Sequence, residues 1–467
     1  MANSRPPRDI APGNADLIVR GNRLVTSEGE RAAAIHIRDG AIVGITPFRE
    51  TQSNCDIYEA SDLVVMPGLV DTHVHINEPG RTQWEGFASA TRAAAAGGVT
   101  TLIEMPLNSI PATTTVPAFQ EKINATDGKL FVDTGFWGGV VPGNAQELHG
   151  LWHAGCFGFK CFLVESGVPE FACVTEPDLR EALPMLAELK APLLVHAELP
   201  QAIEAAMRQS QVSAADPRAY KTWLDSRPRA AENLAIDLLL RLAAEFGASI
   251  HVVHLSSSDA IPALSTARAN HINVSVETCP HYLAFTAEKI ADGATQFKCA
   301  PPIRESENRE KLWSGLSDGT IDMIATDHSP CPPEMKQQQT GSFLDAWGGI
   351  PSLQLSLSVV WTEACRRGYS LSQLAKWMCE APARLAGLAH KKGSIAIGRD
   401  ADLVIWNPDA KFQVEPAKLL HRHKLTPYAG RELSGIVETT FLRGQKIFER
   451  GELSGSPAGR LLLRGKA

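Results

Sequence analysis

The chain has 467 residues, a formal net charge of -7 and a pI near 6.1. This balance excludes a basic surface of the kind that binds nucleic acid or anionic lipid, so we expect a small-molecule partner. The first residues, MANSRPPRDIAPGNADL, lack the apolar core of a signal peptide, and no apolar run approaches the roughly 18 residues of a membrane span. Nine scattered cysteines without Cys-x-x-Cys spacing indicate neither a disulfide framework nor a thiolate zinc site. These features predict a cytoplasmic protein.

Short alternating runs separated by Gly, Asp and Asn occupy residues 15–65, among them DLIVRGNRLVT and AAIHIRDGAIVGI. This pattern is typical of small antiparallel strands. It returns within residues 390–455, in GSIAIGRDADLVIWNP and VETTFLRGQKIFERGE. We therefore expect the two ends of the chain to form one small β-sandwich domain, although two separate β pieces would produce the same pattern.

Residues 66–389 alternate apolar, strand-like segments with helical segments rich in Ala, Leu and Glu. Such alternation is typical of parallel βα units in an α/β fold. The strand candidates number eight, the strand count of a closed (β/α)8 TIM-like barrel. They are residues 65–75, 98–106, 131–140, 158–164, 191–198, 249–257, 272–283 and 322–330.

The first barrel strand contains a His-x-His triplet. Side chains two apart on a strand share a face, so a strand over residues 69–76 points His73 and His75 in the same direction. Two imidazoles on one face can form half of a metal site. Two ordinary histidines on a half-buried strand fit the triplet equally well, so the rest of the chain has to supply further ligands.

Other polar residues lie late in later strands, where TIM barrels carry their active sites. Lys160 lies within the apolar run GFKCFLV, and it could form a salt bridge or, as a carbamate, bridge two cations. His196 ends the strand PLLVHAE. His251 and His254 face opposite sides of their strand, and we choose His254 because it is nearer the strand end. Asp327, which ends MIATDHSP, could cap a helix, bind a metal or accept a proton.

Taken together, these strand ends meet at one rim of the barrel and supply the donors of a two-metal hydrolytic site. At this point the chain resembles the cyclic amidohydrolases of the amidohydrolase superfamily. The motifs that carry the resemblance are PGLVDTHVHINEPGRTQWEGF, GGVTTLIEMPLNSIPAT, GFKCFL, VHAE, HVVHLS, VETCPHYL, KCAPPIR and ATDHSPC, and GRDADLVIW resembles the small β domain of that family.

The resemblance implies a binuclear centre of two divalent ions, usually zinc, and a lysine carboxylated by carbon dioxide. Its ligands are implied to be His73, His75, N6-carboxylated Lys160, His196, His254 and Asp327. The resemblance further implies that a hydroxide held by the two ions would attack the cyclic amide. Asp327 would accept its proton and pass it to the leaving ring nitrogen. The resemblance also implies a homotetramer.

The substrate is expected to be an uncharged ring. Dihydroorotase-like members carry an Arg two residues after His-x-His to pair with a carboxylate, and this chain has Asn77 there. The continuation from Glu78 to Phe87 resembles the members that hydrolyse allantoin to allantoate in purine degradation. A hydantoinase or dihydropyrimidinase acting on another ring is one alternative, and a non-catalytic scaffold homologue is a second.

We predict substrate contacts from strand-end loops. The candidates are Asn108, Thr278, His281, Ala300 and the backbone around Gly349. Asn108 fits a simple turn residue as well. Arg81, Trp84 and Glu85 are expected to fix the loop after strand one. The polar stretch 334–341 is expected to form a mobile loop over the site.

Overall fold

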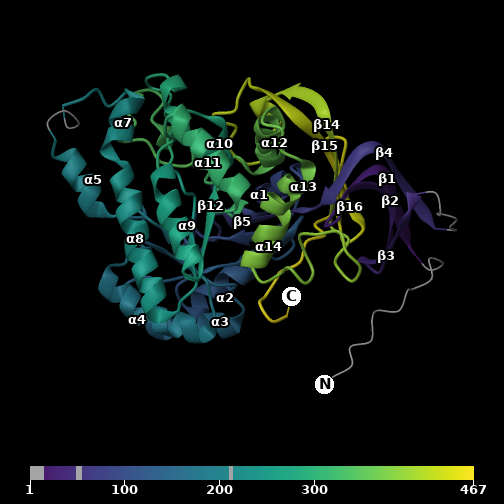
Figure 1. Cartoon of the computed structure of the whole chain (residues 1–467), viewed down its shortest axis with the longest axis horizontal. Helices are drawn as coiled ribbons and strands as arrows, with labels where there is room; N and C mark the ends of the chain where they lie inside the picture. Colours follow the sequence, from purple (N-terminus) through teal and green to yellow (C-terminus); the bar gives the residue numbers. More distant parts are fainter. Residues whose placement is uncertain (1–14, 49–54, 210–213, 467) are drawn as a thin grey trace.

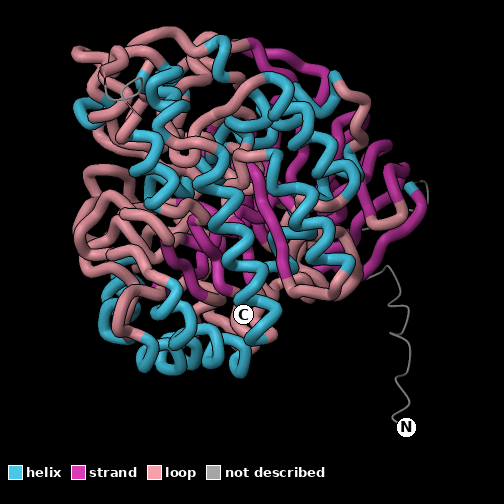
Figure 2. The backbone as a smooth tube through the Cα atoms, turned by 60° about the vertical axis from the view of Figure 1, so that its left-hand side comes forward, coloured by secondary structure: helices cyan, strands magenta, loops and turns pink. Residues whose placement is uncertain are grey.

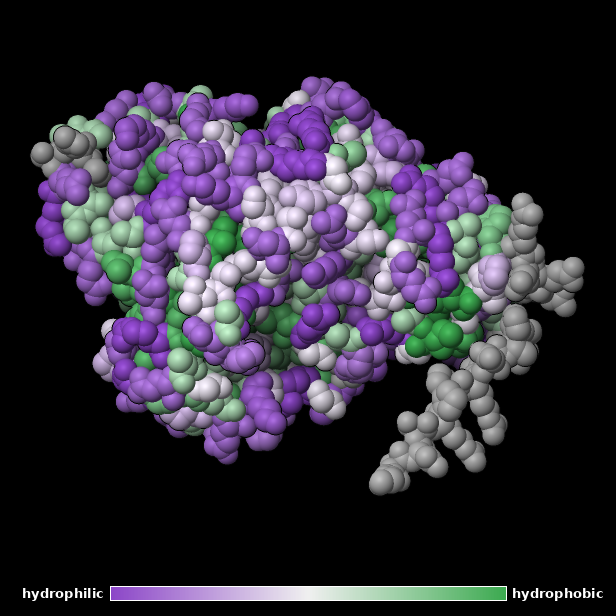
Figure 3. Space-filling model, in the orientation of Figure 1, coloured by the Kyte–Doolittle hydropathy of each residue, from purple (hydrophilic) through white to green (hydrophobic). Residues whose placement is uncertain are grey.

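The computed structural model describes residues 15–48, 55–209 and 214–466. Part of the sequence on which the signal-peptide prediction rests, residues 1–14, lies outside the described residues, and so do residues 49–54 of the predicted terminal β segment. In the described ranges we find no helix with the length and hydrophobicity that crossing a bilayer requires. Hydrophilic side chains cover most of the face seen in Figure 3, with smaller hydrophobic areas between them.

The central part of the chain forms the predicted (β/α)8 barrel (Figure 1). Its parallel strands are β5 Leu69–Val74, β6 Val99–Glu104, β7 Asp133–Phe136, β8 Gly138–Gly139, β9 Phe159–Phe162, β10 Leu193–His196, β11 Ile250–Val252, β12 Val274–Thr278 and β13 Met323–Ile324. The third predicted strand is interrupted at Trp137, so β7 pairs with β6 and β8 pairs with β9. These two short strands fill one of the eight strand positions.

The barrel is closed between its last and first strands. A parallel bridge joins Val74 to His328, and the His75 N–H donates to the His328 carbonyl at 2.9 Å. The His328 N–H in turn donates to the His73 carbonyl at 3.3 Å. Closure therefore places the end of β5 beside the segment that follows β13.

Helices surround the strands (Figure 2). They are α1 Phe87–Ala96, α2 Val116–Ala125, α3 Leu148–Ala154, α4 Glu176–Leu189, α5 Pro200–Met207, α7 Tyr220–Ser226, α8 Arg229–Phe246, α9 Ile261–Ala269, α10 Pro280–Ala284, α11 Ser306–Asp318, α12 Ser356–Arg366, α13 Leu371–Ala375 and α14 Ala381–Leu385. The longest, α8, buries Ala235, Leu239 and Leu242 and ends at Gly247, whose φ of 63° is favourable for glycine.

Strands from both ends of the chain pair in one continuous sheet beside the barrel. They are β1 Leu17–Thr26, β2 Gly29–Arg38, β3 Ala41–Pro47, β4 Asp56–Pro67, β14 Leu403–Gln413, β15 Glu432–Leu442, β16 Gln445–Glu449 and β17 Glu452–Leu453. The eight strands lie in the order β17-β16-β15-β14-β4-β1-β2-β3, so β4 and β14 join the two terminal segments. A separate core that includes Ile35, Val65, Ile405 and Phe441 stabilises this part.

A buried ion-pair network links the sheet to the barrel. The Lys392 ammonium lies 2.7 Å from carboxylate oxygens of Asp133, on β7, and Asp402, and 2.8 Å from Asp400. Three acidic side chains this close to one another could hold a cation. The lysine already supplies that positive charge, so this cluster is structural.

Candidate metal centre

A cavity of about 360 Å³ opens at the carboxyl ends of the barrel strands. Five residues predicted as metal ligands line it, namely His73, His75, His196, His254 and Asp327. They come from the ends of β5 and β10 and from the turns after β11 and β13. The barrel therefore brings together donors that lie as much as 254 residues apart in sequence.

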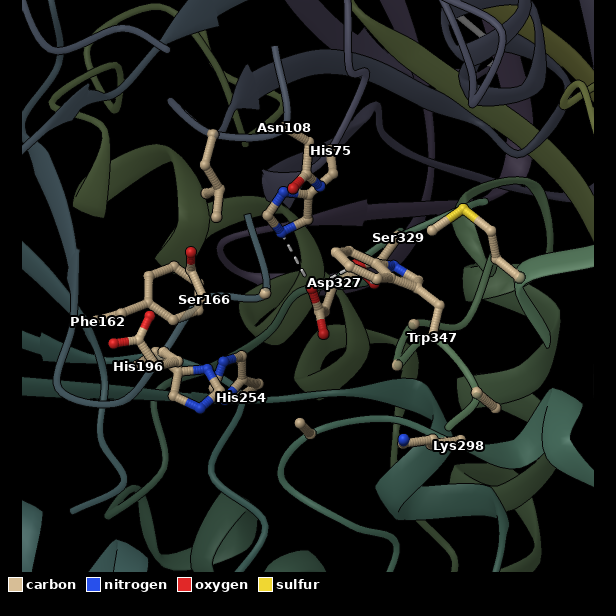
Figure 4. Close-up of a pocket in the computed structure, with 18 of the residues that line it drawn as sticks. His75, Asn108, Phe162, Ser166, His196, His254, Lys298, Asp327, Ser329 and Trp347 are labelled. Carbon is tan, nitrogen blue, oxygen red and sulfur yellow. Dashed lines mark hydrogen bonds and ion pairs between the residues drawn. The ribbon is translucent and has the colours of Figure 1, made fainter. Parts of the chain in front are cut away.

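The first group of donors consists of His73, His75 and Asp327. Oδ1 of Asp327 lies 3.2 Å from Nε2 of His73 and 3.4 Å from Nε2 of His75, and the possible ligand atoms of the three residues all lie within 4.8 Å of one another. Figure 4 shows His75 pointing at the Asp327 carboxylate. Two imidazole nitrogens and a carboxylate oxygen at these separations fit one divalent cation.

The second group consists of His196 and His254, which lie side by side (Figure 4). Their ring centroids are 4.6 Å apart, and His196 also stacks on Phe162 at 4.7 Å. Burial lowers the pKa of both histidines, that of His254 well below the ordinary value. Neutral imidazole is the form that binds metal. His251 takes no part in this group, since its ring contacts Ser275 and Glu277 instead.

Lys160 lies beneath these two groups, fully buried on β9. Its ammonium nitrogen has no hydrogen-bond partner and lies 4.8 Å from the centre of the Phe162 ring. Burial lowers the pKa of Lys160 to about 8, against the opposing charges of Glu277 and Asp327. An ordinary buried lysine is paired, so this orphaned nitrogen is a place where a further group fits. The salt bridge considered from the sequence is not formed.

Two of the predicted metal ligands have unusual backbones. Asp327 has φ 45° and His254 has φ 40°, both in the left-handed region. A side chain other than glycine there costs on the order of 1–3 kcal/mol and persists where the surroundings enforce it. At each of these two positions the chain turns sharply after the strand, and the side chain faces the cavity.

Two buried carboxylates behind the histidines escaped the sequence analysis. Glu277 contacts His73 and His251, and Oε2 of Glu198 lies 2.7 Å from Nε2 of His196. Burial raises the pKa of Glu277, but the charge of His73 and the hydrogen bond from His251 outweigh it and bring it to about 2. Glu277 lies late in the alternating strand segment VSVET, and a charged residue within a predicted strand is the signal that singled out Lys160.

The structure divides the predicted substrate contacts into two sets. Asn108, Ala300 and Gly349 line the cavity, whereas Thr278 and His281 are absent from its lining. The Thr278 hydroxyl donates to the Leu255 carbonyl at 2.9 Å. His281 is buried on α10, with its ring 4.2 Å from that of Tyr282. The chain turns into α10 directly after β12, which keeps both side chains behind the wall.

Other wall residues were not among the substrate contacts predicted from the sequence. Trp223, Arg227, Lys298 and Trp347 all line the cavity. The guanidinium of Arg227 and the ammonium of Lys298 lie 5.0 and 4.3 Å from the Trp223 ring. In Figure 4, Lys298 and Trp347 lie on the side of the cavity away from Phe162. Lys298 and Trp347 therefore shape the side of the pocket away from Phe162.

The stretch 334–341, expected to be a mobile loop, is anchored to this wall. Its first residues lie in the short 3-10 helix η7 Pro333–Lys336. The buried Lys336 ammonium donates to the carbonyls of Lys298 at 3.2 Å and Trp347 at 2.9 Å, and also to that of Gly349. The prediction of a mobile loop rested on polar composition alone. Composition does not show that one buried lysine binds three backbone carbonyls.

The loop after β5 is fixed as expected by its own side chains. Arg81 donates to the Asn108 carbonyl at 2.9 Å and pairs with Glu170. Its guanidinium also lies 5.1 Å from the ring of Trp84, which in turn meets Trp347 edge to face at 5.0 Å. This stack supports the cavity wall from outside.

Comparisons with known proteins show the family of the chain. The model of the amidohydrolase family matches residues 64–447. The chain is 49% identical over 452 residues to an allantoinase of Streptomyces avermitilis, covering 97% of this chain and 99% of the relative. It is 43% identical over 463 residues to an allantoinase of Arabidopsis thaliana, with 95% and 90% covered.

Among solved structures, the L-hydantoinase (dihydropyrimidinase) from Arthrobacter aurescens superposes with a TM-score of 0.91 and 34% identity. The match covers 97% of this chain and 100% of that one. The family match spans the barrel together with β14, β15 and the adjacent ends of β4 and β16. The relatives match nearly the full length of the chain. This chain belongs to the amidohydrolase family.

Proposed function

We propose that the chain is an allantoinase, which hydrolyses the cyclic amide of allantoin to allantoate. The observation that carries this proposal is the convergence of His73, His75, His196, His254 and Asp327 on one cavity. The buried Lys160, which is outside the cavity lining and unpaired among the described residues, lies close enough that its charge adds to burial in lowering the pKa of His75, His196 and His254. The full-length similarity to allantoinases supports the choice of substrate.

We propose that two divalent ions, zinc in the first instance, bind to the four histidines, Asp327 and a carboxylated Lys160. When bound, such ions polarise a carbonyl and lower the pKa of water toward about 7. Lys160 as a neutral amine can form an N–C bond to carbon dioxide and release one proton, which gives a carbamate whose single negative charge is shared by two oxygens. An ammonium has no lone pair with which to form that bond or to bind a cation. The unpartnered nitrogen of Lys160 supports this modification.

Asp327 is proposed to transfer the proton. Burial raises the pKa of Asp327, but the charge of His73 and the hydrogen bond from His75 outweigh burial and hold it well below the ordinary value. The carboxylate is therefore ionised and can accept a proton from the attacking water. The same group then donates it to the departing ring nitrogen, as general acid.

The cavity wall suits a neutral, amide-rich ring. Asn108 offers an amide, and Ala300 and Gly349 offer backbone groups, next to the metal ligands. We propose that these three residues orient the ring. Asn77, at the position where an arginine would pair with a substrate carboxylate, is buried outside the cavity lining, which supports an uncharged substrate.

The test is ring opening of racemic allantoin by metal-replete protein, beside hydantoin, dihydrouracil and dihydroorotate, with metal per chain counted on the same sample. We expect allantoate as the preferred product and about two ions per chain. The Asp327→Asn variant should lose at least about 100-fold in kcat, the scale of general acid-base catalysis. Preference for another ring would contradict the proposed substrate. Absence of both bound metal and turnover would contradict the proposal that the chain is an enzyme.

A second candidate is a hydantoinase, favoured by the likeness to the L-hydantoinase structure. The same substrate panel separates it from the first candidate. We also propose a homotetramer, as the family resemblance suggests. Light scattering on the purified chain tests this, and a monomeric mass would contradict it.

A further inference from the structure

We propose that Glu277 is a positioning residue that couples the two histidine groups of the metal centre, so that its carboxylate controls the binding of both ions. The inference rests on the metal centre of the proposed function. It concerns a side chain outside the ligand set, placed behind the ligands at the end of β12.

One carboxylate oxygen of Glu277 reaches both groups. Oε1 accepts a hydrogen bond from Nδ1 of His73, in the first group, and another from the backbone N–H of His254, in the second, at 3.3 Å. An ionised carboxylate only accepts, so Nδ1 of His73 has to carry the proton. This tautomer leaves Nε2, which lies 3.2 Å from Asp327, as the lone pair that faces the cavity.

The second oxygen fixes the carboxylate itself. Oε2 lies 3.1 Å from Nε2 of His251, and Nδ1 of His251 lies 2.7 Å from the Ser275 hydroxyl. Glu277 and His251 are both fully buried, so water does not compete for these contacts. His251, the histidine that faces away from the cavity, thus has a role as an anchor.

The contact with His254 supports a strained backbone. The φ of 40° at His254 is unfavourable for a residue other than glycine, and its N–H has to find a buried acceptor in that turn. Glu277 supplies this acceptor. Removing the carboxylate therefore releases the His73 ring and the His254 turn together, and with them one ligand from each group.

Glu198 provides a matched comparison. It is likewise a fully buried carboxylate and lies 2.7 Å from a ligand histidine, but among the described histidines it contacts His196 alone, and the same oxygen, Oε2, pairs with Arg227. If coupling is the property of Glu277, the same substitution at Glu198 affects one histidine group and leaves the other unchanged.

The test measures metal affinity by chelator competition on zinc-loaded protein, without substrate. In Glu277→Gln, the amide keeps the shape of the side chain but loses the negative charge. Its N–H donors then face a ring nitrogen of His73 or His251 that itself donates a hydrogen bond. We expect both ions to bind about 10- to 100-fold more weakly, the scale of losses on removal of a partner of a metal ligand. Glu198→Gln should weaken one ion only. Asp402→Asn, a buried carboxylate in the Lys392 network, should leave both affinities unchanged.

Unchanged affinity for either ion in Glu277→Gln would overturn the inference. Should that variant fail to fold, His251→Phe removes only the anchor and keeps an aromatic ring. It is then expected to weaken both ions several-fold, and unaltered binding would contradict coupling. If the wild-type protein binds two ions but does not open allantoin, the proposed substrate is refuted. The metal affinities of the variants still decide the role of Glu277 in that case.

Discussion

The backbone N–H of Arg422 donates to the carboxylate of Glu85, at 3.1 Å to Oε1 and 3.2 Å to Oε2, across 337 residues of sequence. Glu85 also accepts a hydrogen bond from Ser89, and its Oε2 lies 3.7 Å from Nε2 of His328, the residue after Asp327. A segment between β14 and β15 thus meets the loop after β5 directly behind the metal centre.

Glu85→Ala is expected to destabilise the protein. Glu85 is fully buried, and its loss leaves the Arg422 N–H without its acceptor. An unsatisfied buried group costs about 1–3 kcal/mol, to be measured as the free energy of unfolding in urea. The exposed Glu121→Ala on α2 is the control and should change it by less than about 0.5 kcal/mol. Equal stability of the two variants would show that the Arg422 contact contributes nothing.

Lys160→Met is expected to abolish metal binding and turnover while sparing the metal-free fold. Methionine fills a similar volume without an unpaired buried amine, so the metal-free variant should be at least as stable as the wild type. Metal analysis, allantoin turnover and thermal unfolding of the metal-free proteins check this. Retained activity at full metal content would eliminate the bridging role, and supplied bicarbonate should speed metal uptake only in the wild type.

Glu198 is expected to make the stability of the metal-free protein depend on pH. Burial raises the pKa of Glu198, but the charge of Arg227 and the hydrogen bond from His196 outweigh it and bring the value to about 2. Because this pKa is depressed, the stabilisation is complete above the ordinary value of 4.5 and is lost as pH falls toward 2.

The measurement is the difference in unfolding free energy between the wild type and Glu198→Gln. Its pH-dependent part amounts to about 3 kcal/mol for a shift of this size. The difference should shrink by about 1.4 kcal/mol between pH 7 and pH 3.5. A difference that stays constant or grows with acid would contradict the assigned direction of the shift.

Lys336→Met is expected to weaken substrate binding. The buried ammonium holds the carbonyls of Lys298, Trp347 and Gly349, so its loss loosens a wall that touches the ring but not the proton-transfer group. We expect KM for allantoin to rise about tenfold with kcat within a few-fold, as for loss of uniform binding. The exposed Lys391→Met is the control. A fall in kcat at unchanged KM would show that Lys336 acts on the chemical step.

Much of the barrel could be predicted from the sequence because its signals are local. The apolar strands between helical segments predicted the (β/α)8 fold, and polar residues late in those strands predicted which side chains reach the rim. His73, His75, His196, His254 and Asp327 all line the cavity for this reason. The alternation of faces along one strand allowed only one of His251 and His254 to be a ligand, and His254 was chosen because it is nearer the strand end.

Contacts between distant segments could not be predicted in this way. Glu277 and Lys336 act through hydrogen bonds to residues from other strands and loops, and no local period encodes those partners. The position of Thr278 and His281 outside the cavity lining has the same origin, because the turn into α10 decides which side of the wall they occupy.

The sequence by itself thus determined the order of the elements, the side chains that face the rim and the chemical types of the donors. Only the tertiary structure decided that Lys160 has no partner, that Glu277 reaches both histidine groups, and that Arg422 closes the site from behind. The physical reason is that hydrophobic periodicity fixes the face of each element. Closure of the barrel and packing of its loops set the distances between elements.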